Sequence, residues 1–276
     1  MNRLHQRFHS AQTAFREVIR HTSDPKLPGT LFGQALDQLR QLNQDVLKEN
    51  RPVAARRADT DNIVVNTFGG HTLHALETKG GTVNLMFWGA VQTGRWGTER
   101  QHAGAIDAEA GFQPNFLPHV KPWLRGGYTW GSGDDNPNDN AHRTFFQLLP
   151  TPRPYARFPF FNMMNNEDAF GALILRPHAK ITVSSEFHSL RLSNANDLWY
   201  SGGGVFQPWT FGYSGRATSS RRSLGNLYDT NLEFRMNGKL TLTGYFGYTQ
   251  GLAAVKQIYP QGKDAKFGYL EALYRF

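Results

Sequence analysis

The chain has 276 residues, 28 glycines, no cysteine and a formal net charge of +8. Without cysteine it can form neither a disulfide framework nor a thiolate metal site. Its mean hydropathy is −0.52, and no apolar run approaches the roughly 20 residues that a membrane-spanning helix needs, which excludes a bundle of membrane helices. The basic residues are scattered and match no nucleic-acid-binding motif, so we expect no nucleic acid partner.

Residues 1–60 predict a short, partly helical segment. Apolar residues recur every three to four positions over residues 34–49, which predicts an amphipathic helix, and a weaker pattern covers residues 10–20. The opening residues lack the apolar centre of a signal peptide. Two interpretations are therefore open: the chain stays in the cytoplasm, or its true start lies upstream.

From Asn62 onward the hydrophobic period changes to two, which is typical of β-strands. In the last segment, Leu270, Ala272 and Tyr274 alternate with the charged residues Glu271 and Arg275. Glycine, proline, asparagine and aspartate bound the segments. The pattern predicts strands near residues 62–78, 82–93, 103–113, 121–131, 167–176, 180–192, 225–236, 239–250 and 265–276.

The predicted connections between these strands alternate between short and long. The long ones cover Gly94–His102, Gly131–Asn166, Ser193–Leu224 and Gly251–Asp264. Outer-membrane β-barrels have short periplasmic turns at one end and longer external loops at the other. We therefore predict an antiparallel transmembrane β-barrel in the bacterial outer membrane, with the C-terminus in the periplasm. A soluble β-sandwich is the alternative, because alternation alone fits both folds.

Aromatic residues near strand ends predict the two girdles that such barrels place at the membrane interfaces. The candidates are Trp88, Trp96, Trp123, Tyr128, Trp130, Tyr245, Tyr248, Tyr269 and Tyr274. Single-chain bacterial barrels have even strand numbers, whereas nine strands are visible. We therefore expect an incomplete barrel over residues 61–276, with residues 1–60 as an external loop of a longer barrel.

Several stretches resemble the alginate export family of outer-membrane proteins. They are GGHTLHALET (69–78), WGAVQTGRWG (88–97), the stretch from KPWLRGGYTWGSGDD to FNMMN (121–165), DLWYSGGG (197–204) and FGYSGR (211–216). The resemblance implies a large monomeric barrel in outer-membrane lipid, with a basic lumen that passes anionic polysaccharide outward. A terminal Phe276 after alternating apolar residues also resembles the signal read by the barrel assembly machinery.

Charged residues on the polar strand faces are the candidates for lumen-lining, substrate-binding sites. The candidate cations are Arg125, Lys180, Arg235, Lys239 and Arg275. The carboxylates predicted on the same face are Asp107, Glu109, Glu186, Asp229, Glu233 and Glu271. Arginine binds carboxylate through a bidentate fork, which suits a polyuronate. Pairing between neighbouring strands is the alternative role for each of these arginines.

The loop GSGDDNPNDN concentrates the carboxylates Asp134, Asp135 and Asp139, which could supply oxygens to calcium. Its spacing does not follow the EF-hand pattern, and a plain Asx-rich external loop is the alternative. No other cofactor is expected.

No motif places a nucleophile, a base and oxyanion donors together, so we expect no enzyme. The predicted function is a porin for export of an anionic exopolysaccharide such as alginate. A general diffusion porin is the first alternative, and a soluble polysaccharide-binding or lyase-like β-sandwich is the second.

Overall fold

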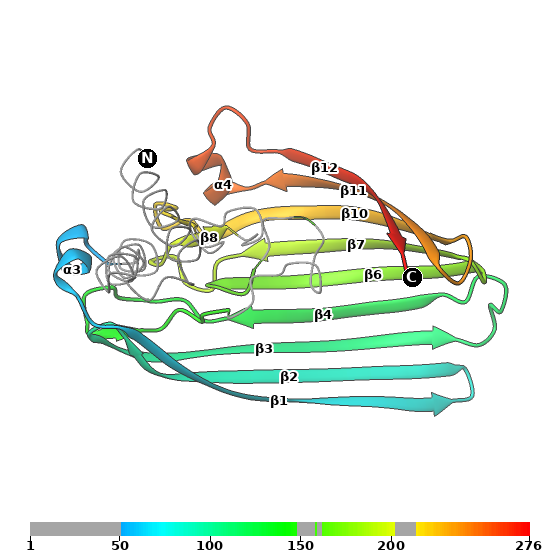
Figure 1. Cartoon of the computed structure of the whole chain (residues 1–276), viewed down its shortest axis with the longest axis horizontal. Coiled ribbons are helices and arrows are strands. Elements are labelled where there is room, and N and C mark those ends of the chain that lie inside the picture. The colour runs from blue at the N-terminus through cyan, green and yellow to red at the C-terminus, as the bar shows by residue number, and fades with distance from the viewer. Residues whose placement is uncertain (1–50, 148–157, 159–161, 202–213) are drawn as a thin grey trace, which may run out of the picture.

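The computed structural model of the chain describes residues 51–147, 158, 162–201 and 214–276, and its dominant element is one antiparallel sheet (Figure 1). Two short helices, α3 (Val53–Ala58) and α4 (Ala253–Ile258), accompany it in this part of the chain. No described helix is long and apolar enough to cross a membrane. The helices expected over residues 10–20 and 34–49 lie outside the described residues.

Ten strands form the main sheet in the described part of the chain, in the order β1-β2-β3-β4-β6-β7-β10-β11-β12, with β5 pairing in parallel with β3. The long strands are β1 (Ile63–Thr78), β2 (Gly81–Trp96), β3 (Glu99–Pro114), β4 (Trp123–Gly131), β6 (Asn166–His178), β7 (Ile181–Arg191), β10 (Ser223–Arg235), β11 (Leu240–Gly251) and β12 (Ala265–Tyr274). The short strands are β5 (Ala141–His142), β8 (Trp199–Ser201) and β9 (Ser214–Arg216), the last two forming a separate pair. Each of the nine predicted strands overlaps one long strand, so the all-β prediction is confirmed.

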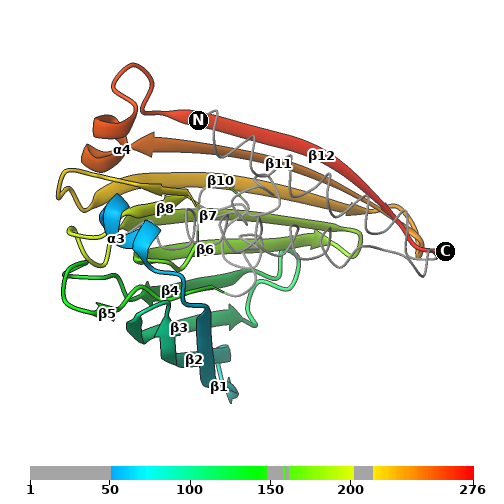
Figure 2. The ribbon, with the colours of Figure 1, turned by 60° about the vertical axis from the view of Figure 1, so that its left-hand side comes forward.

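Strands β1 and β12 lie at the two edges of this sheet (Figure 2). Every neighbouring pair along the order from β1 to β12 is antiparallel, so β1 and β12 run in the same direction. The arrangement fits part of a β-barrel wall rather than the two packed sheets of a β-sandwich.

The connections at the two ends of the sheet differ in length, as Figure 1 shows. One end carries the short turns 79–80, 179–180 and 236–239 and the somewhat longer segment 115–122. The other end carries segments 132–165, 192–222 and 252–264. The C-terminus lies at the end with the short turns.

One predicted long connection is wrong. Strands β2 and β3 extend to Trp96 and Glu99, so only Gly97 and Thr98 separate them, instead of the predicted loop Gly94–His102. Gly97 has φ 69°, a left-handed conformation that favours glycine and allows this tight turn. The β2–β3 hairpin therefore closes with a short turn at the end of the sheet where the other connections are long.

The apolar core lies between the sheet and the segments that fold over it at this long-loop end. Its largest cluster joins Phe158, Leu192 and Trp199 to strand and helix residues, and its buried members are Phe158, Leu190, Leu192, Trp199, Leu224, Leu227 and Ala254. Residues from four separate parts of the chain therefore hold the loops against one sheet face. Burial of these apolar side chains stabilises the docked position of the loop segments on the sheet.

Candidate functional site: a charged sheet face

The register of the strands assigns each side chain to one of two faces, because directly opposed residues lie on the same side of a sheet. Asp107 pairs with Thr129, and Thr129 pairs with Asp168. Glu186 pairs with Asp229. We call the face that carries these residues the charged face; it also includes Glu109, Arg125, His188, Asn231, Glu233, Tyr245, Tyr269 and Glu271.

The opposite face, here called the apolar face, exposes large hydrophobic side chains. Phe68 is 63% exposed, Phe246 54% and Leu270 91%. Other members are Val64, Leu85, Phe87, Val91, Ile106, Leu124, Leu173, Phe187, Leu232, Phe234 and Leu242. A water-soluble sheet protein buries such a face, whereas the wall of a transmembrane β-barrel exposes it to lipid.

The centre of the charged face is a network of buried carboxylates with polar partners. His188 Nδ1 lies 2.6 Å from Asp168 Oδ2, and both side chains are almost fully buried. The hydroxyl of Tyr245 donates to Asp229 Oδ2 at 2.8 Å, and that of Thr129 donates to Asp107 Oδ1 at 3.3 Å. Each contact gives one oxygen of a buried carboxylate a partner, which lowers the cost of its burial, whereas Asp168 Oδ1 has no hydrogen-bond partner among the described residues.

The predicted lumen cations are not gathered into one site. Arg125 pairs with Glu109, and Arg235 Nε lies 2.8 Å from Glu233 Oε1, so these two arginines do pair within the charged face. Lys180, Lys239 and Arg275 instead lie in or beside turns at the short-turn end, where Lys180 Nζ donates to the carbonyl oxygen of Met236 at 3.1 Å. The candidates therefore form two strand ion pairs and a set of cations at the rim.

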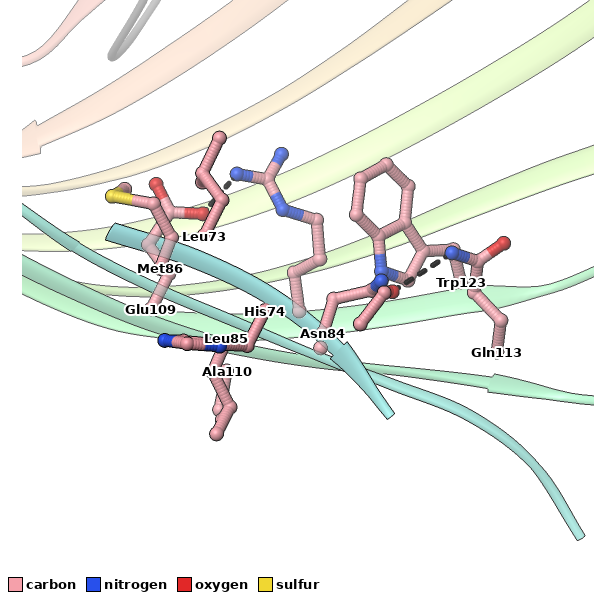
Figure 3. A pocket seen from close by; sticks show the side chains of 12 residues that line it. Leu73, His74, Asn84, Leu85, Met86, Glu109, Ala110, Gln113 and Trp123 are labelled. Carbon is pink, nitrogen blue, oxygen red and sulfur yellow. Dashed lines mark hydrogen bonds and ion pairs between the residues drawn. The ribbon is translucent and has the colours of Figure 1, made fainter. Parts of the chain in front are cut away.

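Trp123, Arg125 and Arg176 form a second arrangement on the charged face, near its short-turn end. The guanidinium carbon of Arg125 lies 4.9 Å from the centre of the Trp123 ring, and that of Arg176 lies 5.9 Å from it. A pocket of about 450 Å³ opens beside Trp123 and Arg125, lined by side chains of β1 to β4 (Figure 3). In Figure 3, Met86 and Glu109 project toward the same side of these strands.

The prediction of an aromatic girdle is wrong for five of its members. Trp88, Trp96, Trp123, Tyr245 and Tyr269 lie on the charged face, because they pair in register with Asp107, Glu99, Ile174, Asn231 and Tyr245 respectively. A position near a strand end predicts the depth of a side chain in the membrane. Whether the side chain lies on the apolar or the charged face depends on the alternation of residues along the strand.

At the long-loop end, glutamines on the strands bind the segment that contains β5. Gln101 Nε2 donates to the carbonyl oxygen of Thr144 at 3.1 Å, and Gln92 accepts from the backbone N–H of Phe146 at 2.8 Å. His142 Nδ1 lies 2.6 Å from Gln101 Oε1, and its ring stacks on Trp96 at 4.2 Å. Burial lowers the pKa of His142 to about 3, with the charge of Arg51 acting in the same direction.

Asp197 joins two loop segments at the same end. Its carboxylate accepts hydrogen bonds from the hydroxyls of Thr144 and Tyr200 and from the backbone N–H groups of Asp134 and Leu198. Burial raises the pKa of Asp197 to about 6 against the opposing effect of these donors. The buried carboxylate of Asp197 and its four hydrogen bonds therefore join the loop segments that lie over the charged face.

The three candidate calcium ligands surround an arginine. Arg143 lies 3.0 Å from Asp135 Oδ1, 2.8 Å from Asp139 Oδ2 and 3.5 Å from Asp134 Oδ1. Among the described residues, no group of three or more His, Cys, Asp or Glu side chains is arranged to hold a metal ion. Calcium binding by these carboxylates stays a prediction.

Sequence reasoning missed several residues of this face. His188, Asp168 and Arg176 were not selected, although His188 is two positions from Glu186 on one strand and therefore shares its face. Trp123 stands two positions before Arg125, so the same rule would have placed it inside. Asp197 lies in a loop, where no periodic signal indicates its burial.

An antiparallel sheet with one exposed apolar face and one charged face is typical of transmembrane β-barrel walls. Within that class, the sequence model described as alginate export matches residues 39–251. The chain belongs to the alginate export family, an outer-membrane family of transport proteins, which gives it a role in export of polysaccharide. The resemblance seen in the sequence is thereby confirmed. No curated protein matches the chain.

Proposed function

We propose that the charged face lines an aqueous lumen through which an anionic polysaccharide, alginate or a related polyuronate, passes the outer membrane without energy input. The observation that carries this proposal is the division of the sheet into a charged and an apolar face. Hydrocarbon requires exposed apolar side chains and paired backbone groups, and a strand meets both conditions with every second residue polar.

On the charged face the arginine side chains are more exposed than the carboxylates, and this difference in exposure supports passage of a polyanion. The carboxylates Asp107, Asp168 and Asp229 are at most 7% exposed and are held by internal hydrogen bonds. The paired cations are more open, since the side chain of Arg125 is 27% exposed and that of Arg235 is 62% exposed. Exposed guanidinium groups can bind uronate carboxylates weakly and in succession, which suits sliding.

The sheet also supports an orientation and a mode of closure. We infer that the short-turn end, with Phe276, lies in the periplasm, and that the C-terminal strand is read by the barrel assembly machinery. Because β1 and β12 run in the same direction, a fully antiparallel monomeric barrel needs an odd number of further strands between them.

Passage through proteoliposomes tests the proposed function. Vesicles containing the full-length protein and fluorescent polygalacturonate should release the polymer faster than empty vesicles. Arg125→Glu should slow this release, because it places a second carboxylate beside Glu109 on the pathway. The matched control is Arg95→Glu, which makes the same charge change at an exposed position on the opposite face. Equal release from both variants and the unmodified protein would remove the charged face from the pathway.

A general diffusion porin is the second candidate, and the excess of carboxylates on the charged face favours it. Asp107, Glu109, Asp168, Glu186 and Asp229 outnumber the strand arginines Arg125, Arg176 and Arg235 there. Neutral dextran of matched size separates the two functions. Equal release of dextran and polygalacturonate would favour the general porin.

A further inference from the structure

The pocket beside Trp123 is built around one glycine. A Cβ atom at Gly111 would lie 2.5 Å from Trp123 Nε1 and 3.4 Å from Arg125 Cγ. Only a residue without a side chain therefore lets the indole lie against the sheet at this position. The indole nitrogen is buried there and has no hydrogen-bond partner among the described residues.

Two contacts orient the guanidinium of Arg125, the cation that lines this pocket. The guanidinium of Arg125 lies over the Trp123 ring and pairs with Glu109, so the indole and the carboxylate fix its plane from two directions. Arg176 places a second guanidinium near the same ring. An arginine makes five N–H donors available, and one carboxylate partner leaves several of them for a ligand.

The rest of the lining combines polar and apolar groups. Gln113 Nε2 donates to Asn84 Oδ1 at 2.8 Å. The second Nε2 hydrogen and the Oε1 atom of Gln113, and the amide N–H groups of Asn84, are left for hydroxyl groups of a ligand. Leu73 and Met86 supply apolar surface. The volume of about 450 Å³ lies within the range of roughly 300–1,000 Å³ that is typical of small-molecule sites.

We propose that this pocket binds one uronate unit of the polysaccharide. Arg125 takes its carboxylate, Gln113 and Asn84 bind its hydroxyls, and Leu73 and Met86 contact its apolar ring edge. The proposal rests on the proposed function and gives it a defined entry site, because Trp123 begins β4 at the short-turn end. A polymer that enters from the periplasm meets this pocket before the buried carboxylate network.

Calorimetry with a defined probe tests the pocket. Trigalacturonate should bind the full-length, detergent-solubilised protein, and neutral maltotriose should bind much more weakly. Arg125→Gln should weaken trigalacturonate binding about 10- to 100-fold, as expected for loss of a charged hydrogen bond. Arg95→Gln is the matched control, since it makes the same charge change at an exposed position on the apolar face of β2 and should leave binding unchanged.

The outcomes separate this pocket from the proposed function. Absence of trigalacturonate binding, unchanged binding by Arg125→Gln, or equal loss in Arg95→Gln would each overturn the pocket assignment. Polygalacturonate release from vesicles that persists in any of these cases would leave the proposed function standing. Tight trigalacturonate binding without polymer release would support the pocket and contradict passage. Circular dichroism of each variant verifies that the sheet is intact.

Discussion

The hydroxyl of Thr144 donates to Asp197 Oδ2 at 2.5 Å, although 53 residues separate the two in sequence. This hydrogen bond joins the segment that follows β5 to the segment that precedes β8. Both segments fold over the charged face at the long-loop end. The contact therefore joins two of the segments that cover that end.

Asp197→Ala should undock these loops without unfolding the sheet. The change leaves the hydroxyls of Thr144 and Tyr200 and the backbone N–H of Asp134 without their acceptor. Buried donors without partners cost about 1–3 kcal/mol each, so we expect much faster proteolysis in the loops and an unchanged β-sheet spectrum. Asp135→Ala, at a more exposed carboxylate, is the control. Equal proteolysis of the two variants would show that Asp197 does not hold the loops.

His142→Phe should remove the weakening of loop docking between pH 6.5 and 5 that protonation of His142 causes, although it also removes the hydrogen bond to Gln101. The pKa of His142 is lowered by burial to about 3, so undocked loops take up a proton that docked loops exclude. Docking is fully stable above pH 6.5 and weakens as the pH falls toward 3, by about 2 kcal/mol at pH 5. Phenylalanine keeps the ring stacked on Trp96 and removes the proton.

Asp197 acts in the opposite direction in the same pH range. Its pKa, raised by burial to about 6, makes docking most stable below about 3.8 and weaker as the pH rises through 6. The unmodified protein should therefore respond less to pH than either His142→Phe or Asp197→Asn. Hydrogen exchange of the loop amides at pH 5 and 7.5 measures this, and an equal response in all three proteins would contradict it.

Gly111→Leu should close the pocket beside Trp123. The new side chain collides with the indole and with Arg125, so we expect loss of trigalacturonate binding and a destabilisation of about 1–3 kcal/mol from overpacking. Gly171→Leu is the matched control, since a Cβ there meets nothing within 4 Å. Retained binding by Gly111→Leu would place the ligand elsewhere.

Removal of calcium should leave the loop of Asp134, Asp135 and Asp139 unchanged, because Arg143 already supplies positive charge to these carboxylates. The Arg143 guanidinium also lowers the pKa of Asp139, which keeps that carboxylate ionised. Loop proteolysis with and without EDTA measures the effect. Faster cleavage in EDTA would support the calcium prediction, whereas Arg143→Met should increase cleavage in either buffer.

The sequence alone determined the strands, because a period of two is a local property that each segment carries in its own residues. It also separated the two faces, because parity places Leu270 and Phe246 on the apolar face and Asp107 and Glu109 on the charged face once each strand is assigned. The same local logic fails at Gly94–His102: the glycines there predict a loop, whereas β2 and β3 continue to a turn of two residues.

Only the tertiary structure decided which residues meet across strands and loops. Register brings Asp168 to His188 and Trp123 to Arg176, and neither pair can be found from spacing along one segment. The burial of Asp197 depends on segments 53 and 63 residues away, which fold over the sheet by packing rather than by any periodic pattern. Local periodicity thus determines the strands of the sheet, whereas long-range contacts form the pocket on its charged face and hold the loops over one end.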